Sequence, residues 1–147
     1  PRIKKIINSL CELLGEEKNG IYTFPTPERI MEAGLEGIAP IKSGFRAKYI
    51  LDAATKVTSG EISIERIAKS GYESALAELK LIKGVGDKVA NCVLLFGFGY
   101  YEAFPIDVWI KKVMAKYFSE DFDHTTLGQY AGIAQQYLFY YERYIEG

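Results

Sequence analysis

Two glycines separated by one valine constrain the fold of this chain more than any other feature. Residues 79–92 read Leu-Lys-Leu-Ile-Lys-Gly-Val-Gly-Asp-Lys-Val-Ala-Asn-Cys. We predict a helix that ends near Lys80, a tight turn over residues 82–86, and a second helix that starts at once. Gly84 and Gly86 leave no Cβ in the way, so the turn can approach a bulky, anionic partner closely. The free N–H groups at the start of the second helix would face that partner as well.

The composition favours one folded domain over residues 1–147. Hydrophobic residues make up 48% of the chain, which argues against disorder, and no apolar run approaches the roughly 20 residues of a membrane span. Cys11 and Cys92 have neither metal nor disulfide spacing and indicate a reducing compartment. The net charge of −1 is an objection to a nucleic-acid partner. Against it stand the lysines around the turn and the later Pro-Ile-Asp: Lys80, Lys83, Lys88, Lys111 and Lys112.

Apolar residues recur at helical spacing along most of the chain, so we predict an all-α fold of short helices without a strand pair. A polar loop is expected over residues 15–20, and Thr26 and Asp107 are expected helix caps. The predicted helices cover residues 2–14, 27–34, 45–57, 63–69, 72–80, 86–97, 108–118 and 126–144. Tyr49 is predicted to face inward. Apolar residues line one side of the second hairpin helix, namely Val89, Cys92, Val93 and Phe96, and the last helix carries Tyr130, Ile133, Tyr137, Leu138 and Tyr141.

Leu-x-x-Ile-Lys-Gly-Val-Gly-Asp-Lys-Val-Ala, followed nineteen residues after its lysine by the aspartate of Pro-Ile-Asp, resembles the helix-hairpin-helix DNA glycosylases. These enzymes carry a Gly/Pro-rich loop and an aspartate. The 8-oxoguanine DNA glycosylases are the most similar group, because they share Gly-Val-Gly-x-Lys-Val-Ala-x-Cys and a second signature, Tyr-Ala-Gly-Ile-Ala-Gln-x-x-Leu-Phe, over residues 130–139. The resemblance covers nearly the whole chain.

This resemblance implies a multi-helix glycosylase domain with a helix-hairpin-helix motif that binds double-stranded DNA containing a damaged base. It implies a monomer without a membrane partner, inside the cell (bacterial cytoplasm or nucleus). Enzymes of this group place a further domain before the matching segment. We therefore expect residues 1–147 to be a fragment of a longer enzyme that lacks its N-terminal domain.

The resemblance assigns the chemistry to Lys88 and Asp107. Lys88 would attack the sugar C1′ and form a Schiff base, so that strand scission follows base excision. Asp107 would stabilise the cationic sugar that develops as the glycosidic bond breaks. Simpler explanations exist for both residues, because a lysine near a helix start is usually a solvated charge and aspartate is a favoured N-cap. No cofactor is expected for catalysis.

Six further residues are assigned to the base pocket by the resemblance. Phe139 would stack on the extruded base, Gln135 would bind its Watson–Crick edge, and Cys92 would pack against it beside the lysine. A core aromatic and a buried cysteine are the alternatives. The other three depart from the family pattern, which usually has Met, His and Asp in their places; they are Phe96, Trp109 and Glu142.

The DNA backbone contacts are assigned to the hairpin turn, through Lys83, Gly84, Val85 and Gly86. The resemblance also implies a structural cation, without a catalytic part, on backbone carbonyl groups of Lys80, Ile82 and Val85.

Phe45 and Arg46 match a pair that acts on the opposite strand in the resembling enzymes. The aromatic ring wedges into the gap left by the flipped base, and the arginine reads the orphaned partner. The usual aromatic residue is Tyr, so Phe45 is a departure. A core phenylalanine beside a surface arginine is the alternative.

Other functions remain open on the sequence alone. Glycosylases of the endonuclease III type, with a different lesion, usually carry a four-cysteine iron–sulfur site, but no cysteine follows Cys92, so we expect no cluster. Adenine-mismatch glycosylases usually lack the lysine. A non-catalytic helix-hairpin-helix DNA-binding module would have no need of Lys88 and Asp107 together. The segment could also be a structural piece of a larger enzyme.

Overall fold

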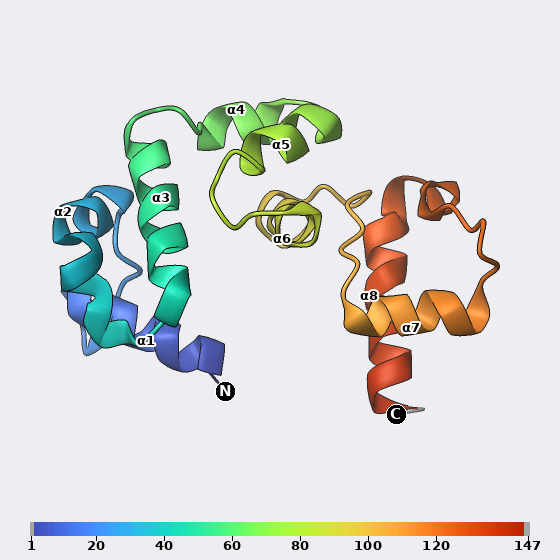
Figure 1. Cartoon of the computed structure of the whole chain (residues 1–147), viewed down its shortest axis with the longest axis horizontal. Helices are drawn as coiled ribbons and strands as arrows, with labels where there is room; N and C mark the ends of the chain where they lie inside the picture. The colour runs from blue at the N-terminus through green and yellow to red at the C-terminus, as the bar shows by residue number, and fades with distance from the viewer. Residues whose placement is uncertain (1, 146–147) are drawn as a thin grey trace. The chain divides into compact units, whose positions relative to one another are not determined.

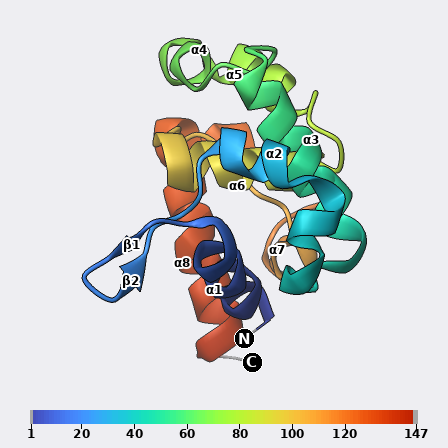
Figure 2. The ribbon, with the colours of Figure 1, turned by 90° about the vertical axis from the view of Figure 1, so that its left-hand side faces the viewer.

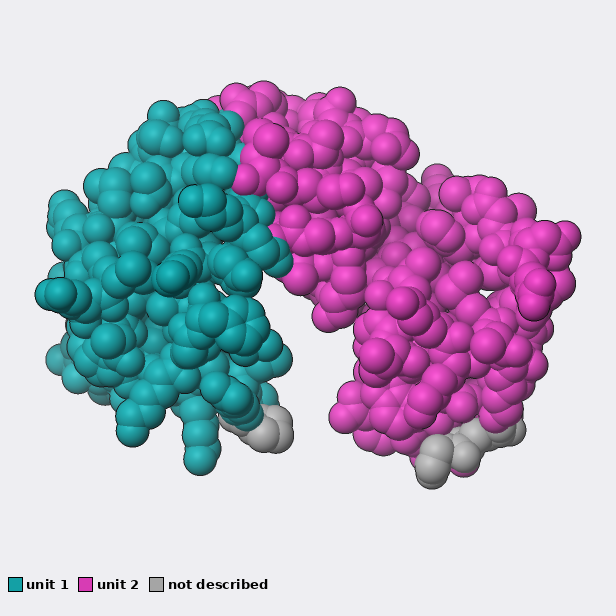
Figure 3. All heavy atoms as spheres, viewed as in Figure 1, with its two compact units in different colours: residues 1–64, 82–84 teal, residues 65–81, 85–147 magenta. Residues whose placement is uncertain are grey.

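The computed structural model describes residues 2–145, which form two compact units (Figure 3). Unit 1 comprises the residues up to Ile64 together with Ile82–Gly84, and unit 2 comprises Glu65–Leu81 and the residues from Val85 on. The all-α class is confirmed, because among the described residues strands occur only in two segments of two residues each. None of the helices there has the length and apolar character needed to cross a membrane. The single domain over residues 1–147 stays a prediction.

Unit 1 is built around the packing of α2 against α3 (Figure 1). Thr26 caps α2, since its Oγ1 accepts a hydrogen bond from the Arg29 N–H at 3.4 Å, and Pro27 stands at the first helical position. The buried core of the unit consists of Leu10, Ile30, Ile38, Ile41 and Ala54. The elements are α1 (Arg2–Leu14), β1 (Glu17–Lys18), β2 (Ile21–Tyr22), α2 (Pro27–Ile38), η1 (Ala39–Ile41), η2 (Gly44–Arg46) and α3 (Ala47–Thr58).

The predicted polar loop after α1 is wrong in part, because β1 and β2 pair there as an antiparallel hairpin (Figure 2). Lys18 pairs with Ile21, which leaves Asn19 and Gly20 as a two-residue turn with φ values of 54° and 79°. Positive φ at both turn residues is the requirement of the tight hairpin turn that Asn-Gly favours. The dipeptide was therefore a usable signal for this hairpin.

Two helix boundaries in unit 1 also differ from the prediction. Gly34 does break the helical geometry, with φ 63° and ψ −170°, but helical turns resume and α2 continues to Ile38. The helix predicted from Phe45 begins as the 3-10 turn η2, and α3 starts at Ala47. Tyr49 does not face inward as expected, because 38% of it is exposed.

Unit 2 carries the two hairpin helices and the closing pair α7 and α8, which pack against each other (Figure 1). Phe104, Ile110 and Ala131 form a buried cluster beside this pair. The elements are α4 (Ile64–Lys69), which starts at the boundary between the units, α5 (Tyr72–Leu79), α6 (Asp87–Val93), a π-helical turn η3 (Leu94–Phe98), α7 (Val108–Tyr117), a 3-10 segment η4 (His124–Tyr130) and α8 (Ala131–Tyr144).

The apolar residues predicted on the later helices do not coincide with the buried ones. On α6 and η3 the buried residues are Ala90, Asn91, Leu94 and Leu95, and Val89 and Phe96 are exposed. The predicted helix over residues 126–144 is divided at Gly128, whose φ of 71° interrupts η4 before α8 begins. Three tyrosines of this region are exposed; they are Tyr130, Tyr137 and Tyr141.

Candidate active site

A cavity of about 230 Å³ in unit 2 brings together residues from α6, α8 and the segment between η3 and α7. Six of the eight residues predicted for the catalytic pair and base pocket line it: Lys88, Cys92, Phe96, Asp107, Gln135 and Phe139. Pro105 and Gln136 complete the lining and were not predicted. Residues from α6, η3, the segment before α7 and α8 therefore line one cavity, although their roles stay predictions.

Asp107 is the N-cap of α7, as predicted. Its Oδ1 accepts hydrogen bonds from the backbone N–H groups of Trp109 at 3.0 Å and Ile110 at 2.9 Å. Both bonds end on the same oxygen, and no hydrogen bond or ion pair within residues 2–145 ends on Oδ2. The carboxylate therefore caps the helix and still has a second oxygen for a charge that develops in the cavity.

Lys88 is the second residue of α6 and is exposed. No hydrogen bond or ion pair holds its ammonium group within the described chain. Lys80 and Lys83 differ in this respect, since Lys80 pairs with Asp87 at 2.6 Å and Lys83 pairs with Asp52 at 3.6 Å. Lys88 thus lines the cavity, and its amine has no hydrogen-bond or ion-pair partner in the described chain.

Gln135 is almost fully buried, with 3% of the residue exposed. Its Nε2 donates a hydrogen bond to the Pro105 carbonyl at 2.9 Å, and its Oε1 accepts one from the Gln136 amide. The bond to Pro105 ties α8 to the segment that leads to Asp107, and the other bond lies within α8. A base that bound Gln135 would have to share or replace one of them.

Trp109 and Glu142 are absent from the lining of this cavity. The ring of Trp109 lies against Lys112, whose Nζ is 4.5 Å from the ring centroid. Glu142 pairs with Lys116 at 3.2 Å and accepts a hydrogen bond from the Tyr117 hydroxyl at 3.3 Å. Both side chains have structural partners, and their assignment to the base pocket remains a prediction without support from the geometry.

Phe45 and Arg46 belong to unit 1 and are described there alone. Phe45 is 65% exposed, which excludes the alternative of a core phenylalanine. The guanidinium carbon of Arg46 lies 4.6 Å from the Phe45 ring centroid, and the Tyr49 ring meets Phe45 edge-on at 5.9 Å. The exposed ring is therefore braced by two neighbours, an arrangement that suits a side chain used at a surface.

The carbonyl groups predicted to hold a cation are those of Lys80, Ile82 and Val85. Outside helix interiors, no backbone hydrogen bond in the described part of the chain ends on any of these oxygens. Carbonyl oxygens are hard ligands that suit a structural cation without catalytic duties. Each group by itself fits the predicted use, and the cation stays a prediction.

Asn91 is a residue that sequence reasoning missed. It is 7% exposed and makes three hydrogen bonds. Its Oδ1 accepts from the Tyr72 hydroxyl at 2.8 Å and from the Phe104 N–H at 3.1 Å, and its Nδ2 donates to the Asp87 carbonyl at 2.8 Å. Desolvation raises the pKa of Tyr72, which keeps the phenol protonated as a donor. Asn91 thereby joins the helix that carries Lys88 to the strand-like segment before Asp107.

Replacing Asn91 by Leu, which has a similar shape, should lower the free energy of unfolding by about 1–3 kcal/mol. The reason is that the buried Phe104 N–H would lose its acceptor. Urea denaturation measures the change. Tyr72→Phe is the matched control, since it removes one bond to Asn91 and leaves the Phe104 bond intact, and it should cost less than Asn91→Leu. Equal stability of the Asn91→Leu variant and the parent protein would show that this contact is dispensable.

Comparison with known proteins places the chain in a family. A family model described as HhH-GPD superfamily base excision DNA repair protein matches residues 1–127. The chain belongs to this superfamily. Among solved HhH-GPD structures that resemble it, one of MBOgg1 in complex with a low-affinity DNA ligand is 41% identical and superimposes with a TM-score of 0.87, covering 100% of this chain and 55% of that one.

Another HhH-GPD structure, the Clostridium acetobutylicum 8-oxoguanine glycosylase/lyase with DNA containing cytosine opposite 8-oxoguanine, is 38% identical with a TM-score of 0.84, over 97% of this chain and 54% of that one. The "Probable N-glycosylase/DNA lyase" of Methanothermobacter thermautotrophicus is 38% identical over 83% of this chain and 48% of its own length. The N-glycosylase/DNA lyase of Saccharomyces cerevisiae is 32% identical over 76% and 34%. The chain thus spans half or less of the curated relatives' length.

Proposed function

We propose that this chain carries the catalytic centre of a DNA glycosylase that removes 8-oxoguanine from duplex DNA and then cleaves the strand. One observation carries the proposal. Lys88, whose amine has no partner in the described chain, and Asp107, whose Oδ2 accepts no hydrogen bond there, line the same cavity as Phe139 and Cys92. The relatives named as 8-oxoguanine glycosylase/lyase and N-glycosylase/DNA lyase support the same reaction. We further propose an intracellular enzyme that acts as a monomer, as the resemblance implies.

In the proposed reaction the Lys88 amine, which must be uncharged to act as a nucleophile, attacks C1′ of the damaged nucleotide. A nitrogen–carbon bond forms while the glycosidic bond breaks, and the base leaves with the electron pair of that bond. Positive charge develops on the sugar during this step, and Asp107, whose Oδ2 has no competing partner in the described chain, supplies the opposite charge. The nitrogen then loses a proton, and the C1′–O4′ bond breaks as O4′ takes up a proton, which gives the Schiff base. Loss of a proton from C2′ then expels the 3′ phosphate by β-elimination and breaks the DNA strand. Lysine and aspartate supply the nucleophile and the charge, so the chemistry requires no cofactor.

The proposed base pocket consists of Phe139, Cys92 and Gln135, with Gln136 as an addition to the predicted set. Phe139 offers a ring on which an extruded base can stack. It also packs against the core cluster of Phe104, Ile110 and Ala131, so the stacking role and the core role coexist. Its function in the pocket can be tested only by separating these two roles.

Phe139→Ala should weaken binding to lesion DNA by about 1–3 kcal/mol, through loss of base stacking, and should hardly change binding to undamaged duplex. Fluorescence anisotropy, measured well below the melting temperature of the variant, gives both affinities. Tyr137→Ala is the matched control, because Tyr137 lies on the same helix, is 74% exposed and does not line the cavity. An equal loss of affinity on both DNAs would assign Phe139 to the core alone.

The proposed reaction is tested with duplexes that carry 8-oxoguanine opposite each base in turn, in the presence of borohydride. Base release, strand cleavage and a covalent adduct on these duplexes are the expected results. Duplexes with guanine and with 3-methyladenine serve for comparison, because a 3-methyladenine DNA-glycosylase from Archaeoglobus fulgidus is 27% identical with a TM-score of 0.73. Excision of another base would replace the proposed lesion. Binding without any excision would favour a non-catalytic module.

A further inference from the structure

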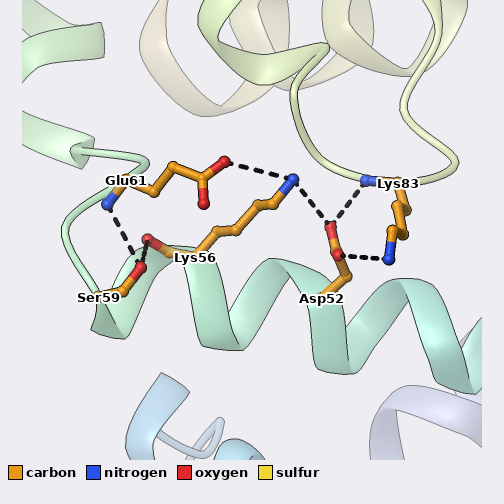
Figure 4. A network of polar contacts seen from close by, with 5 residues as sticks. All are labelled: Asp52, Lys56, Ser59, Glu61 and Lys83. Carbon is orange, nitrogen blue, oxygen red and sulfur yellow. Dashed lines mark hydrogen bonds and ion pairs between the residues drawn. The ribbon is translucent and has the colours of Figure 1, made fainter.

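The hairpin turn is fastened to α3 by Asp52 (Figure 4). Oδ2 of Asp52 accepts a hydrogen bond from the backbone N–H of Lys83 at 2.8 Å, and Oδ1 lies 3.6 Å from the Lys83 ammonium nitrogen. One carboxylate therefore holds both the main chain and the side chain of the same turn residue. All of these atoms belong to unit 1.

An apolar contact within unit 1 holds the same turn, in which Ile82 is 9% exposed. Gly84 has a φ of 80°, and a Cβ added to it would meet the Tyr49 ring at 2.3 Å. Glycine is thus required there twice, by the backbone conformation and by the packing of Tyr49. Tyr49 and Asp52 stand three residues apart on α3, so they face the turn from the same side of that helix.

The carboxylate of Asp52 is held in its charged form. The hydrogen bond from the Lys83 N–H and the nearby charges of Lys56 and Lys83 lower the pKa of Asp52 from its ordinary value and outweigh desolvation. The Lys56 ammonium nitrogen lies 3.5 Å from Asp52 Oδ2 and 3.4 Å from Glu61 Oε1. Figure 4 draws both ion pairs as dashed lines. The side chain of Asp52 is 13% exposed, in contrast to 74% for Lys83.

A negative charge at this place opposes DNA binding in two ways. It repels phosphate, and it occupies one of the lysines predicted to bind DNA. Because the negative charge of Asp52 opposes DNA binding, we expect this residue to have a structural role that compensates for that cost. The contacts above supply one, because they fix a turn that would otherwise lose conformational entropy on binding.

We propose that Asp52 is a positioning residue, which holds the hairpin turn in its DNA-binding shape before DNA arrives. This inference rests on the proposed function in one respect, that the turn contacts DNA. It concerns binding and not chemistry, since Asp52 and Lys83 do not line the cavity that holds Lys88.

The test compares Asp52→Asn with Asp52→Ala. Both substitutions remove the same negative charge, but only asparagine keeps an oxygen that can accept the Lys83 N–H bond. Binding to undamaged duplex, measured by anisotropy at low salt, should be roughly 3- to 10-fold weaker for Asp52→Ala than for Asp52→Asn, the factor expected for one hydrogen bond. Asp52→Asn should bind as well as the parent protein or better. Single-turnover excision at saturating DNA should be equal in all three proteins.

Glu61→Gln is the control for charge. It removes a negative charge from the same network and leaves Asp52 as the acceptor of the Lys83 N–H, so its DNA affinity should not fall. Where Asp52→Ala does not fold, Asp52→Leu replaces it, because leucine fills a similar volume and likewise lacks an acceptor. Equal affinities of the Asn and Ala (or Leu) variants would overturn the inference. A parent protein that binds DNA but excises no base would refute the proposed function and leave this comparison valid.

Discussion

Lys88→Gln is expected to abolish borohydride trapping on 8-oxoguanine DNA and to leave DNA binding in place. A glutamine amide cannot form the carbon–nitrogen bond to C1′ that a Schiff base requires. Excision should fall by on the order of 10³-fold or more, because loss of a covalent nucleophile removes the step itself. Lys88 is exposed and holds no partner in the described chain, so the stability of the variant should change by only about 0.5 kcal/mol.

Gel analysis of the trapped complex and thermal unfolding together measure these effects. Lys69→Gln is the matched control, since Lys69 is an exposed lysine on α4 that pairs with Glu65 and lies outside the cavity. It should trap as the parent protein does. If Lys88→Gln trapped as much as Lys69→Gln, another amine would be the nucleophile.

Local signals predicted much of this fold. Helical spacing of apolar residues located α1 with its buried Leu10, and Thr26 and Asp107 were recognised as caps because their side chains act within three residues. Six residues of the cavity followed from motifs in the hairpin, the Pro-Ile-Asp segment and the last helix. Only the resemblance indicated that these motifs lie close together, because the spacing of residues along the sequence cannot show that α8 lies near α6.

Contacts between distant residues could not be predicted from the sequence. Asp52 meets the Lys83 N–H across 31 positions, and Asn91 meets the Phe104 N–H across 13. A polar residue inside a helix gives no periodic signal of its partners, so Asn91 went unnoticed. Gln135 was assigned to a base through the resemblance, and its hydrogen bond to the Pro105 carbonyl, 30 positions away, could not be predicted from the sequence.

On the last helix, the spacing of tyrosines does not show which face is buried. Tyr137 and Tyr141 recur at helical spacing, yet both are exposed. A tyrosine ring is apolar and its hydroxyl is polar, so it occurs on buried and solvated faces alike. The buried residues of α8 are small or polar instead, namely Ala131, Gly132 and Gln135.

Asp107→Asn should reduce base excision by roughly 10²-fold or more and leave the fold nearly unchanged. An asparagine oxygen can still accept the N–H bonds of Trp109 and Ile110, so the cap survives and the free energy of unfolding should fall by no more than about 1 kcal/mol. The variant loses the negative charge that would stabilise the cationic sugar, and preorganised charge is a large contribution to catalysis. Single-turnover excision of 8-oxoguanine and urea denaturation give the two quantities.

The chain supplies a closely matched control for this substitution. Asp123 is the N-cap of η4, and its Oδ1 accepts the Thr125 N–H at 2.9 Å, but it does not line the cavity. Asp123→Asn therefore makes the same chemical change at a cap and should leave excision intact. If the two variants excised 8-oxoguanine equally well, Asp107 would be a helix cap only. A large loss confined to Asp107→Asn would instead assign the charge of its carboxylate to the reaction, because capping is preserved in both.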